Sequence, residues 1–375
     1  MKKEDIIIIG GGLSGLTAAI HLARAGCSVT LFEPQAYPRH RVCGEYVSNE
    51  VLPYLEHLGI SVWDNGALPI QKMAISDASG TLAQAKLPLG GFGLSRFGFD
   101  QLLYHKALEM GVRFIFRKIG TVHFLSDHFV LSDVQGTEYR ARLVIGAYGK
   151  RSQLDKWLKR PFAFRKQSWL AVKAHYALDD FPDDLVALHN FEGGYGGLSK
   201  TELGTVNFCY LVHYDSFKRY KGVDDFNERV VAQNPHLEHF LERASPTFKT
   251  PLTIAQIAFD RKHPVEGHML MCGDSAGLIH PLCGNGMAMA IHSAKLASEA
   301  VVRHLGKGEG HRLAMETDYA SAWNRTFRRR LWYGRKIQGI LLNQKLLNVG
   351  LSAARHSQGL MRYAIKKTHG KPVMP

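Results

Sequence analysis

Two glycine-marked segments, Ile6 to Glu33 and Met271 to Glu299, have residue types that could bring bare backbone against a phosphate-bearing cofactor. In the first segment, Gly10, Gly12 and Gly15 fill the frame G-x-G-x-x-G. Glycine at these three positions would permit a tight turn, the approach of main-chain N–H groups to a pyrophosphate, and the close packing of a helix on a strand. The frame therefore indicates a dinucleotide site.

The elements around this frame fall at the offsets that such a site needs. The apolar run from Ile6 to Ile9 suits a buried parallel strand, and Leu13 opens a helical pattern whose positive N-terminus would face the phosphates. We therefore assign Leu13 and Ser14 to the cofactor site with the glycines. A second strand ends in Glu33, where a carboxylate would bond ribose hydroxyls, which disfavours NADP and leaves FAD or NAD.

The second segment decides between these cofactors. Its pattern from Gly273 to Gly286, G-D-x-A-G-x-x-x-P-x-x-G-x-G, resembles that of the FAD-dependent geranylgeranyl reductase and aromatic-ring monooxygenase (p-hydroxybenzoate hydroxylase-like) superfamily. The resemblance implies that Asp274 holds the flavin ribityl chain and pyrophosphate. It also implies that Gly284 and Gly286 bring a helix N-terminus under the isoalloxazine, with Pro281 and Asn285 in the same loop. A positive helix end there would stabilise the charge that a flavin gains on reduction.

Further residues enter the site through this resemblance. The Cys43-Gly44-Glu45 run is similar to a segment that lies beside the flavin ring in the geranylgeranyl reductase branch. It implies Cys43 as a proton donor, with packing as a small hydrophobe as the alternative, and Glu45 as an acid–base candidate, with a surface or hydrogen-bonding role as the alternative. Arg39 or Arg41 could neutralise the pyrophosphate, with a solvated surface arginine as the alternative. Arg96 matches an arginine that touches the cofactor in this family. The backbone of Val122 matches one that meets the adenine, although strand packing explains this valine equally well.

Two departures from the family pattern concern the reaction. Tyr148 stands where the ring-hydroxylating branch has an aspartate that helps to place FAD and a visiting NADPH. In the aromatic segment of the reductase branch, Tyr195 survives as a predicted substrate contact, whereas Gly197 replaces the tryptophan. The first departure argues against an NADPH-dependent hydroxylase, and the second leaves the shape of the substrate pocket open.

The fold expected is α/β, with a Rossmann-type FAD-binding domain (1–72, 95–162 and 262–318), an inserted antiparallel-sheet substrate domain (73–94 and 163–261) and a basic helical C-terminal region (319–375). The alternating stretches Leu170 to Tyr176 and Gly204 to Val212 favour a sheet with one covered face. A chain of 375 residues with 45% hydrophobic content can bury a core of this size.

Charge and cysteine usage limit the partners. There is no second glycine frame after a strand, so NAD(P)H would visit only transiently. The five cysteines lack metal-ligand spacing and no signal peptide is evident, which predicts a reduced, cytoplasmic protein without a metal site. Residues 319–375 hold twelve Lys or Arg and no Asp or Glu. This region could pack on the core or make peripheral contact with an anionic membrane, whereas nucleic-acid binding lacks any recognition motif.

We therefore predict an FAD-dependent oxidoreductase that reduces or dehydrogenates a hydrophobic, isoprenoid- or polyketide-like small molecule. One alternative is a flavin monooxygenase that hydroxylates an aromatic or phenolic ring. Another is a non-catalytic flavin protein that carries electrons to a partner. The sequence specifies neither the substrate, the electron donor nor the oligomeric state.

Overall fold

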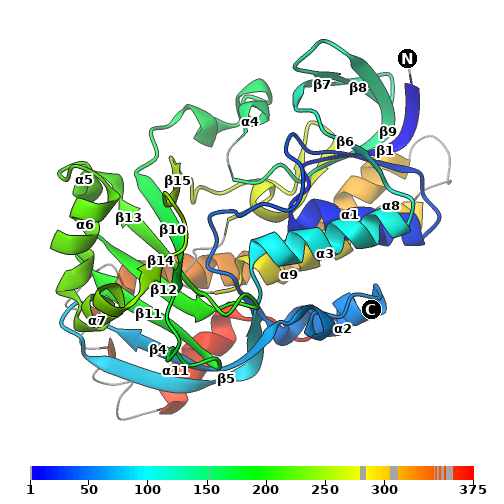
Figure 1. The fold of residues 1–375 in the computed structure, drawn as a ribbon. Coiled ribbons are helices and arrows are strands. Elements are labelled where there is room, and N and C mark those ends of the chain that lie inside the picture. Colours follow the sequence, from blue (N-terminus) through cyan, green and yellow to red (C-terminus); the bar gives the residue numbers. More distant parts are fainter. Residues whose placement is uncertain are drawn as a thin grey trace.

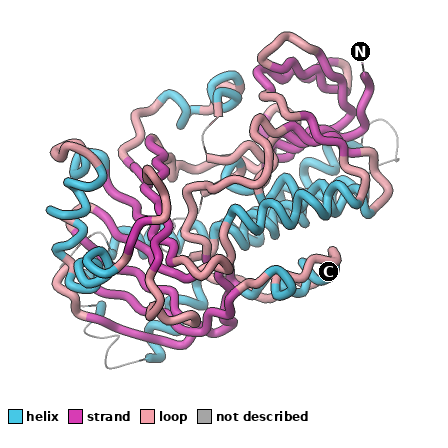
Figure 2. Tube along the Cα trace, viewed as in Figure 1, coloured by secondary structure: helices cyan, strands magenta, loops and turns pink. Residues whose placement is uncertain are grey.

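The computed structural model describes residues 2–150, 152–278, 284–304, 311–341, 343, 346–347, 350–351 and 358–375. These residues form two β-sheets that lie side by side, each with helices against it (Figures 1 and 2). The first sheet contains the strand that precedes the glycine frame. The second contains most of the alternating strands from the middle of the chain.

The first sheet has a parallel centre, in which β1 lies between β2 and β9. Ile6, Ile7 and Ile8 of β1 are completely buried, as expected for an apolar run covered on both faces. Strands β7, β8 and β9 add an antiparallel meander. The strands of this sheet are β1 (Lys2–Ile9), β2 (Val29–Phe32), β6 (Arg113–Ile115), β7 (Ile119–Leu125), β8 (His128–Asp133), β9 (Glu138–Gly146), β16 (Val265–Glu266) and β17 (Met269–Met271).

Four long helices pack with one another beside this sheet (Figure 1). Small residues let them approach closely: Ala18 and Ala19 of the first helix and Ala294 and Ala297 of the third are fully buried. The four are α1 (Leu13–Arg24), α3 (Arg96–Glu109), α8 (Gly286–His304) and α9 (His311–Leu341). Two shorter helices, α2 (Leu52–His57) and α4 (Gln153–Trp157), lie in the connections.

The second sheet is antiparallel except where β11 runs parallel to β4. Helices α5 (Tyr214–Phe217), α6 (Val223–Arg229) and α7 (Pro235–Arg243) lie along one side of it, and their apolar residues join a buried cluster with Val172, Phe208 and Tyr210. The strands are β3 (Tyr46–Ser48), β4 (Leu68–Ser76), β5 (Leu82–Gly93), β10 (Trp169–Ala177), β11 (Leu185–Phe191), β12 (Gly194–Lys200), β13 (Val206–His213), β14 (Ser245–Pro246) and β15 (Leu252–Ala255).

The opposite face of the second sheet is apolar in one part and polar in another. Side chains alternate between the faces of a strand, so Ala171, Lys173 and His175 of β10 share this opposite face. Ala171 joins a buried apolar cluster with Leu188, Tyr195 and Leu211. Four residues of the C-terminal region complete that cluster: Leu347, Leu351, Met361 and Ile365. The last two belong to α11 (Gln358–Thr368), which lies against β5.

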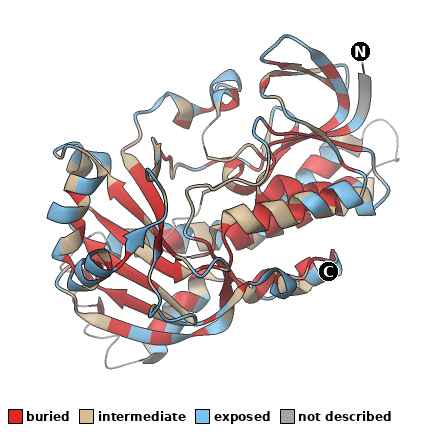
Figure 3. Ribbon diagram, in the orientation of Figure 1, coloured by how far each residue is buried: buried red, intermediate tan, exposed pale blue. Residues whose placement is uncertain are grey.

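The predicted α/β architecture, with its antiparallel-sheet insertion and helical C-terminal region, is confirmed. The second sheet also recruits β3 and the start of β4, which precede the expected boundary at residue 73; the domain limits themselves stay a prediction. Both sheets are buried along their central strands (Figure 3). Among the described helices, none combines the length and the apolar content that crossing a bilayer requires.

A buried histidine should make the stability of the fold depend on pH. Burial, followed by nearby His236, lowers the pKa of His189 to about 3. An unfolded chain takes up a proton on this ring near pH 6.5 while the folded chain does not, so stability is lost as the pH falls from about 7 toward 3. Going from pH 7 to pH 5 should lower the free energy of unfolding by about 2 kcal/mol through this residue alone.

Urea titrations of the wild type and a His189→Gln variant at the two pH values measure this contribution. The variant should lose about 2 kcal/mol less stability on acidification than the wild type does. Equal losses in the two proteins would show that His189 does not contribute.

Candidate functional site

The glycine frame lies between β1 and α1, where backbone packs on backbone. A Cβ on Gly10, whose φ is +105°, would lie 2.4 Å from the carbonyl oxygen of Ala147, and one on Gly15 would lie 1.9 Å from the carbonyl oxygen of Gly10. Gly12 precedes α1, and no side chain caps that helix. The N–H groups of its first turn are therefore left for a ligand, as a pyrophosphate requires.

The second glycine segment meets the first at this point. A Cβ on Gly273, at φ +59°, would lie 2.6 Å from Ser14 Oγ. Ser275 connects the pair to the loop after β9, because its Oγ accepts from the backbone N–H of Gly149 at 2.9 Å. Leu13 and Ser14 are both buried in this junction. Two segments that are far apart in the sequence thus form one cradle.

Lys262 hydrogen-bonds to the backbone of Asp274, the predicted ribityl and pyrophosphate ligand. Its Nζ donates to the carbonyl oxygen of Asp274 at 2.7 Å and lies 4.6 Å from the ring centre of Phe162. Burial lowers the pKa of Lys262 to about 8, against the opposing influence of Asp274 and Asp155. The sequence interpretation missed this lysine, although a cation twelve residues before a cofactor aspartate was a usable signal.

Arg96 faces Gly12. Its Nη2 would lie 3.7 Å from a Cβ at Gly12, and its guanidinium donates to both carboxylate oxygens of Asp100, at 2.8 and 2.7 Å. Burial opposes the charge, yet Asp100 and the side chain of Cys43 hold the pKa of Arg96 above its ordinary value. A permanent cation therefore lies beside the phosphate-binding turn and the Cys43 thiol.

Glu33 directly follows β2 and accepts several hydrogen bonds at the expected ribose position. Its Oε2 accepts from the backbone N–H of Gly11 at 2.9 Å, and it pairs with Arg39 at 2.9 Å and with Arg41 at 3.2 Å. Arg41 also donates to Asp100 at 3.0 Å. The structure thus places Arg41 beside Glu33, the predicted ribose ligand; the contact of Arg41 with the pyrophosphate stays a prediction.

The loop with Cys43 and Glu45 is anchored to the second sheet. Asn207 Nδ2 donates to the carbonyl oxygen of Cys43 and Ser199 Oγ to that of Gly44, each at 3.2 Å. The Cys43 side chain is half-buried against the core of the first sheet. This arrangement keeps the thiol between the two sheets.

Glu45 is completely buried and has a left-handed φ of 55°. Its Oε1 accepts from Lys173 Nζ at 2.5 Å and from the backbone N–H of Arg96 at 2.6 Å, while Oε2 lies 2.7 Å from His175 Nε2. Although burial opposes it, Lys173 followed by His175 lowers the pKa of Glu45. Its carboxylate is therefore fully hydrogen-bonded, which fits the hydrogen-bonding alternative better than a free acid.

The same cluster has the composition of a metal site but not its electrostatics. Ligand atoms of His40, Glu45 and His175 lie within 4.8 Å of one another. However, the ammonium of Lys173 is hydrogen-bonded to Glu45 Oε1, so a metal cation would have to displace this ammonium. Burial and Lys173 lower the pKa of His40 to about 4. Lys173 and His175 were missed from sequence, although two polar residues at alternate positions of an apolar strand were the available signal.

The remaining predicted residues of the second glycine segment that the structure describes lie around the start of α8. Gly284, at φ +58°, leaves only 3.1 Å between a Cβ and the ring of Tyr46, and Gly286 begins α8. Asn285 Nδ2 donates to the carbonyl oxygen of Thr368 at 3.0 Å and to Glu50 Oε2 at 3.3 Å, so its side-chain amide is engaged by protein. Pro281 lies outside the described residues.

Two predictions fall on strands. The carbonyl oxygen of Val122 on β7 accepts from Trp157 Nε1 at 3.0 Å, so this carbonyl already has a protein partner. Tyr195 on β12 is 3% exposed and lies in the apolar cluster of the second sheet. Tyr148, the departure from the family aspartate, donates to Asp155 Oδ1 at 3.3 Å. These contacts leave the roles of Val122 and Tyr195 as predictions.

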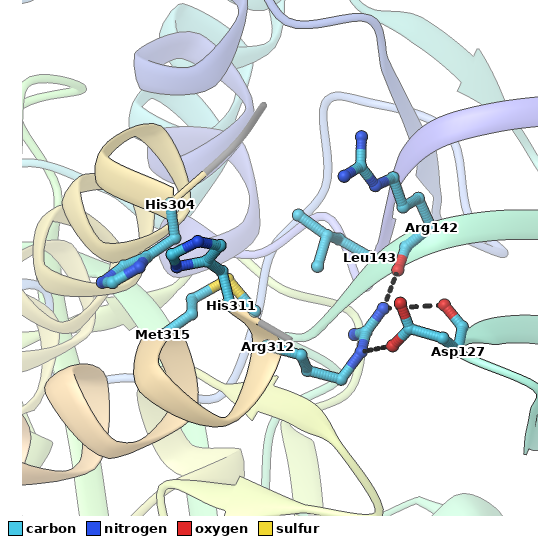
Figure 4. Close-up of a pocket in the computed structure, with 7 residues that line it drawn as sticks. All are labelled: Asp127, Arg142, Leu143, His304, His311, Arg312 and Met315. Atoms are coloured by element: carbon cyan, nitrogen blue, oxygen red, sulfur yellow. Dashed lines mark hydrogen bonds and ion pairs between the residues drawn. The ribbon is translucent and has the colours of Figure 1, made fainter. Parts of the chain in front are cut away.

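A small cleft on another part of the surface contains none of the predicted site residues. Arg312 reaches across it to Asp127 Oδ1 at 2.6 Å and to the carbonyl oxygen of Arg142 at 2.8 Å (Figure 4). The lining consists of Asp127, Arg142, Leu143, His304, His311, Arg312 and Met315. Because Arg312 closes this cleft with its own ion pair, the cradle is the better candidate for the cofactor.

The cradle fits FAD on the geometry of the chain alone. It offers uncapped N–H groups at α1, glycines where any side chain would collide with backbone, a carboxylate at the ribose position and Arg96 as a fixed cation. The start of α8 supplies a second positive helix end. These are the groups that a diphosphate and a reduced flavin ring require.

Comparisons with known proteins agree. Residues 5–68 match the family model described as pyridine nucleotide-disulphide oxidoreductase. The chain is 24% identical over 319 residues to a menaquinone reductase of Mycobacterium tuberculosis, covering 79% of this chain and 76% of that protein. It is 26% identical over 342 residues to a 3-demethoxyubiquinol 3-hydroxylase of Escherichia coli, covering 82% of each.

The fold is shared with a solved structure. A geranylgeranyl bacteriochlorophyll reductase-like protein from Thermoplasma acidophilum superposes with a TM-score of 0.78 at 17% identity, over 98% of this chain and 96% of the other. These findings confirm the predicted resemblance and its oxidoreductase class. At such identities the choice between reduction and hydroxylation depends on the chemistry of the site.

Proposed function

We propose that this FAD flavoprotein of the geranylgeranyl reductase and aromatic-ring monooxygenase superfamily reduces a carbon–carbon double bond of a hydrophobic, isoprenoid-like substrate. The observation that carries the proposal is the position of Cys43, between the cofactor cation Arg96 and the face of the second sheet that is apolar around Tyr195. A thiol there could protonate a carbon atom without admitting water.

Each group has a separate role in the proposed reduction. Bound FAD in its reduced form would supply a hydride to one alkene carbon. Cys43 would give its proton to the other carbon, and Arg96 would stabilise the resulting thiolate by its charge. The buried cluster of Ala171, Leu188, Tyr195 and Leu211, completed by C-terminal residues, would form an apolar wall beside the hydrocarbon chain and exclude solvent.

Anaerobic reoxidation tests this proposal. Photoreduced protein is mixed with a polyprenyl alkene, and flavin absorbance is followed. We expect reoxidation without oxygen, and a Cys43→Ser variant should be slower by about a hundredfold with the alkene but unchanged with ferricyanide, which needs no proton. If only oxygen with a phenolic substrate reoxidises the flavin and yields a hydroxylated product, the monooxygenase alternative replaces the proposal. If neither alkenes nor phenolic substrates are converted, the electron-carrier alternative stands.

We also propose that the C-terminal region contacts an anionic membrane surface, from which such a substrate would come. Trp332, Ile340 and Tyr363 are 50%, 44% and 58% exposed, and the ammonium of Lys336 lies 5.7 Å from the ring centre of Trp332. Lys366 is exposed on α11 as well. Aromatic rings interleaved with cations suit the interface of an acidic bilayer.

Sedimentation with vesicles should show the contact. Vesicles with anionic lipid should bind the protein, and neutral vesicles should bind it at least tenfold less, because each cation near the surface contributes about 1 kcal/mol. A Lys336→Ala/Lys366→Ala variant should bind anionic vesicles more weakly by on the order of tenfold. Trp63→Ala, at another exposed tryptophan, is the control. Equal, negligible binding to both kinds of vesicle would contradict the contact.

A further inference from the structure

A chain of hydrogen bonds connects the buried Glu45 with the surface of the second sheet. Glu45 Oε2 lies 2.7 Å from His175 Nε2, and His175 Nδ1 lies 3.2 Å from Thr205 Oγ1. Thr205 is half-buried, and it adjoins a turn in which Leu203 is 53% exposed. Both ring nitrogens of a buried histidine therefore lie on one continuous path from the interior to the solvent.

The inner end of this path reaches the cofactor side of the sheet. Lys173 is completely buried and donates to the other oxygen of Glu45. Its partner across the β10–β13 ladder is Cys209, and the pKa of that thiol is raised to about 12, first by burial and then by Cys43. Lys173, Cys209 and the Cys43 loop thus occupy one region between the two sheets.

The groups around the path suit proton transfer. A hydroxyl both donates and accepts, and an imidazole can take a proton on one nitrogen while it releases one from the other. The ring of His40 lies edge-on to that of His175 at 5.0 Å, and the ring of Phe248 stacks on His175 at 5.0 Å and lies 4.6 Å from His40. His175 is 1% exposed, so its two hydrogen-bond partners define the route.

We infer that Thr205, His175 and Glu45 form a proton path that supplies Lys173, which in turn reprotonates Cys43 after each turnover. The inference rests on the proposed function, because saturation of each double bond consumes one proton. A proton from water enters through the Thr205 hydroxyl to Nδ1 of His175, and the proton on His175 Nε2 passes to the Glu45 carboxylate. Glu45 then gives that proton to the neutral amine left on Lys173 after Lys173 has protonated Cys43, and returns to a carboxylate. No electrons move along the path, and one proton enters for each one consumed.

Proton uptake during photoreduction of the FAD-loaded protein tests this path without any substrate. Flavin reduction takes up protons, which phenol red reports in weakly buffered solution. Thr205→Val removes the hydroxyl at the same volume and should slow proton uptake about tenfold or more. Thr205→Ser keeps the hydroxyl and should stay within about twofold of the wild type. Thr247→Val is the matched control, since the Thr247 hydroxyl donates to the backbone oxygen of His175, at 3.1 Å, and not to its imidazole.

Equal uptake rates in the valine and serine variants would overturn the path. If the valine variant fails to bind FAD, Thr205→Ala removes the same hydroxyl and takes its place. The outcome is independent of the alkene experiment. Slow uptake in Thr205→Val together with no reaction with alkenes would support proton entry through Thr205 but reject the proposed reaction and, with it, the reprotonation of Cys43, whereas alkene reduction with normal uptake would reject the path and support the reaction.

Discussion

Gly12→Ala should weaken FAD binding by about a hundredfold while changing the free energy of unfolding of the apoprotein by no more than about 1 kcal/mol. The backbone at Gly12 has φ −87°, which any residue adopts, and the nearest atom to an added Cβ is Arg96 Nη2 at 3.7 Å. The protein therefore has room for the methyl group. A bound pyrophosphate would not, because the methyl group would displace it from N–H donors that each contribute about 1.5–3 kcal/mol.

This substitution separates the cofactor from the fold. Gly10→Ala and Gly15→Ala would collide with backbone and so destabilise the protein itself. Flavin fluorescence titrations and urea unfolding of the Gly12→Ala apoprotein measure the two effects. Gly120→Ala on β7, where a Cβ meets its nearest atom at an ordinary 3.6 Å, is the control. Unchanged FAD affinity in Gly12→Ala would show that the cofactor does not approach this turn.

Lys173→Met should lower the free energy of unfolding by about 3–5 kcal/mol, the largest effect expected of a single substitution on stability. Lys173 and Glu45 are both completely buried and lie 2.5 Å apart. Without the ammonium, a carboxylate stays in the interior with His175 and one backbone N–H as its partners. An uncompensated buried charge is expensive, whereas a pair of neutral groups is not.

A double variant isolates the charge effect. Glu45→Gln/Lys173→Met removes both charges and should recover at least about half of the lost stability in urea unfolding. Lys72→Met breaks the exposed pair with Asp184 and should change stability by less than about 1 kcal/mol. If the double variant is as unstable as the single one, the loss comes from packing of the lysine side chain and not from its charge.

The sequence could predict the cradle because its features are local. The turn at Gly10, the helix start at Leu13 and the carboxylate at Glu33 follow from neighbouring residues and from fixed offsets between elements. The same holds for the second segment, because the whole pattern lies in one continuous stretch from Gly273 to Gly286. The family resemblance and the fold class were predicted on these grounds and are confirmed.

The partners of Glu45 could not be predicted in this way. Lys173 and His175 lie on β10, more than a hundred positions along the chain, and only the register of the second sheet brings them to Glu45. Similarly, Asn285 was assigned to the cofactor loop from its pattern, yet its amide is held by Thr368 and Glu50. Such contacts depend on how segments far apart in the sequence pack against each other. No short sequence pattern specifies that packing.

The hydrogen bonds that join Asn285 and Glu50 to the helical C-terminal region have a consequence for how the protein is made. Asn285 finds its partner at Thr368, and Glu50 finds partners at Arg330 and at the backbone N–H of Gly370. While a ribosome is still adding residues after α8, these groups have nothing to bind. The nascent chain would therefore bind FAD late, after synthesis of α11. Until then, the incomplete site would be exposed to chaperones and proteases.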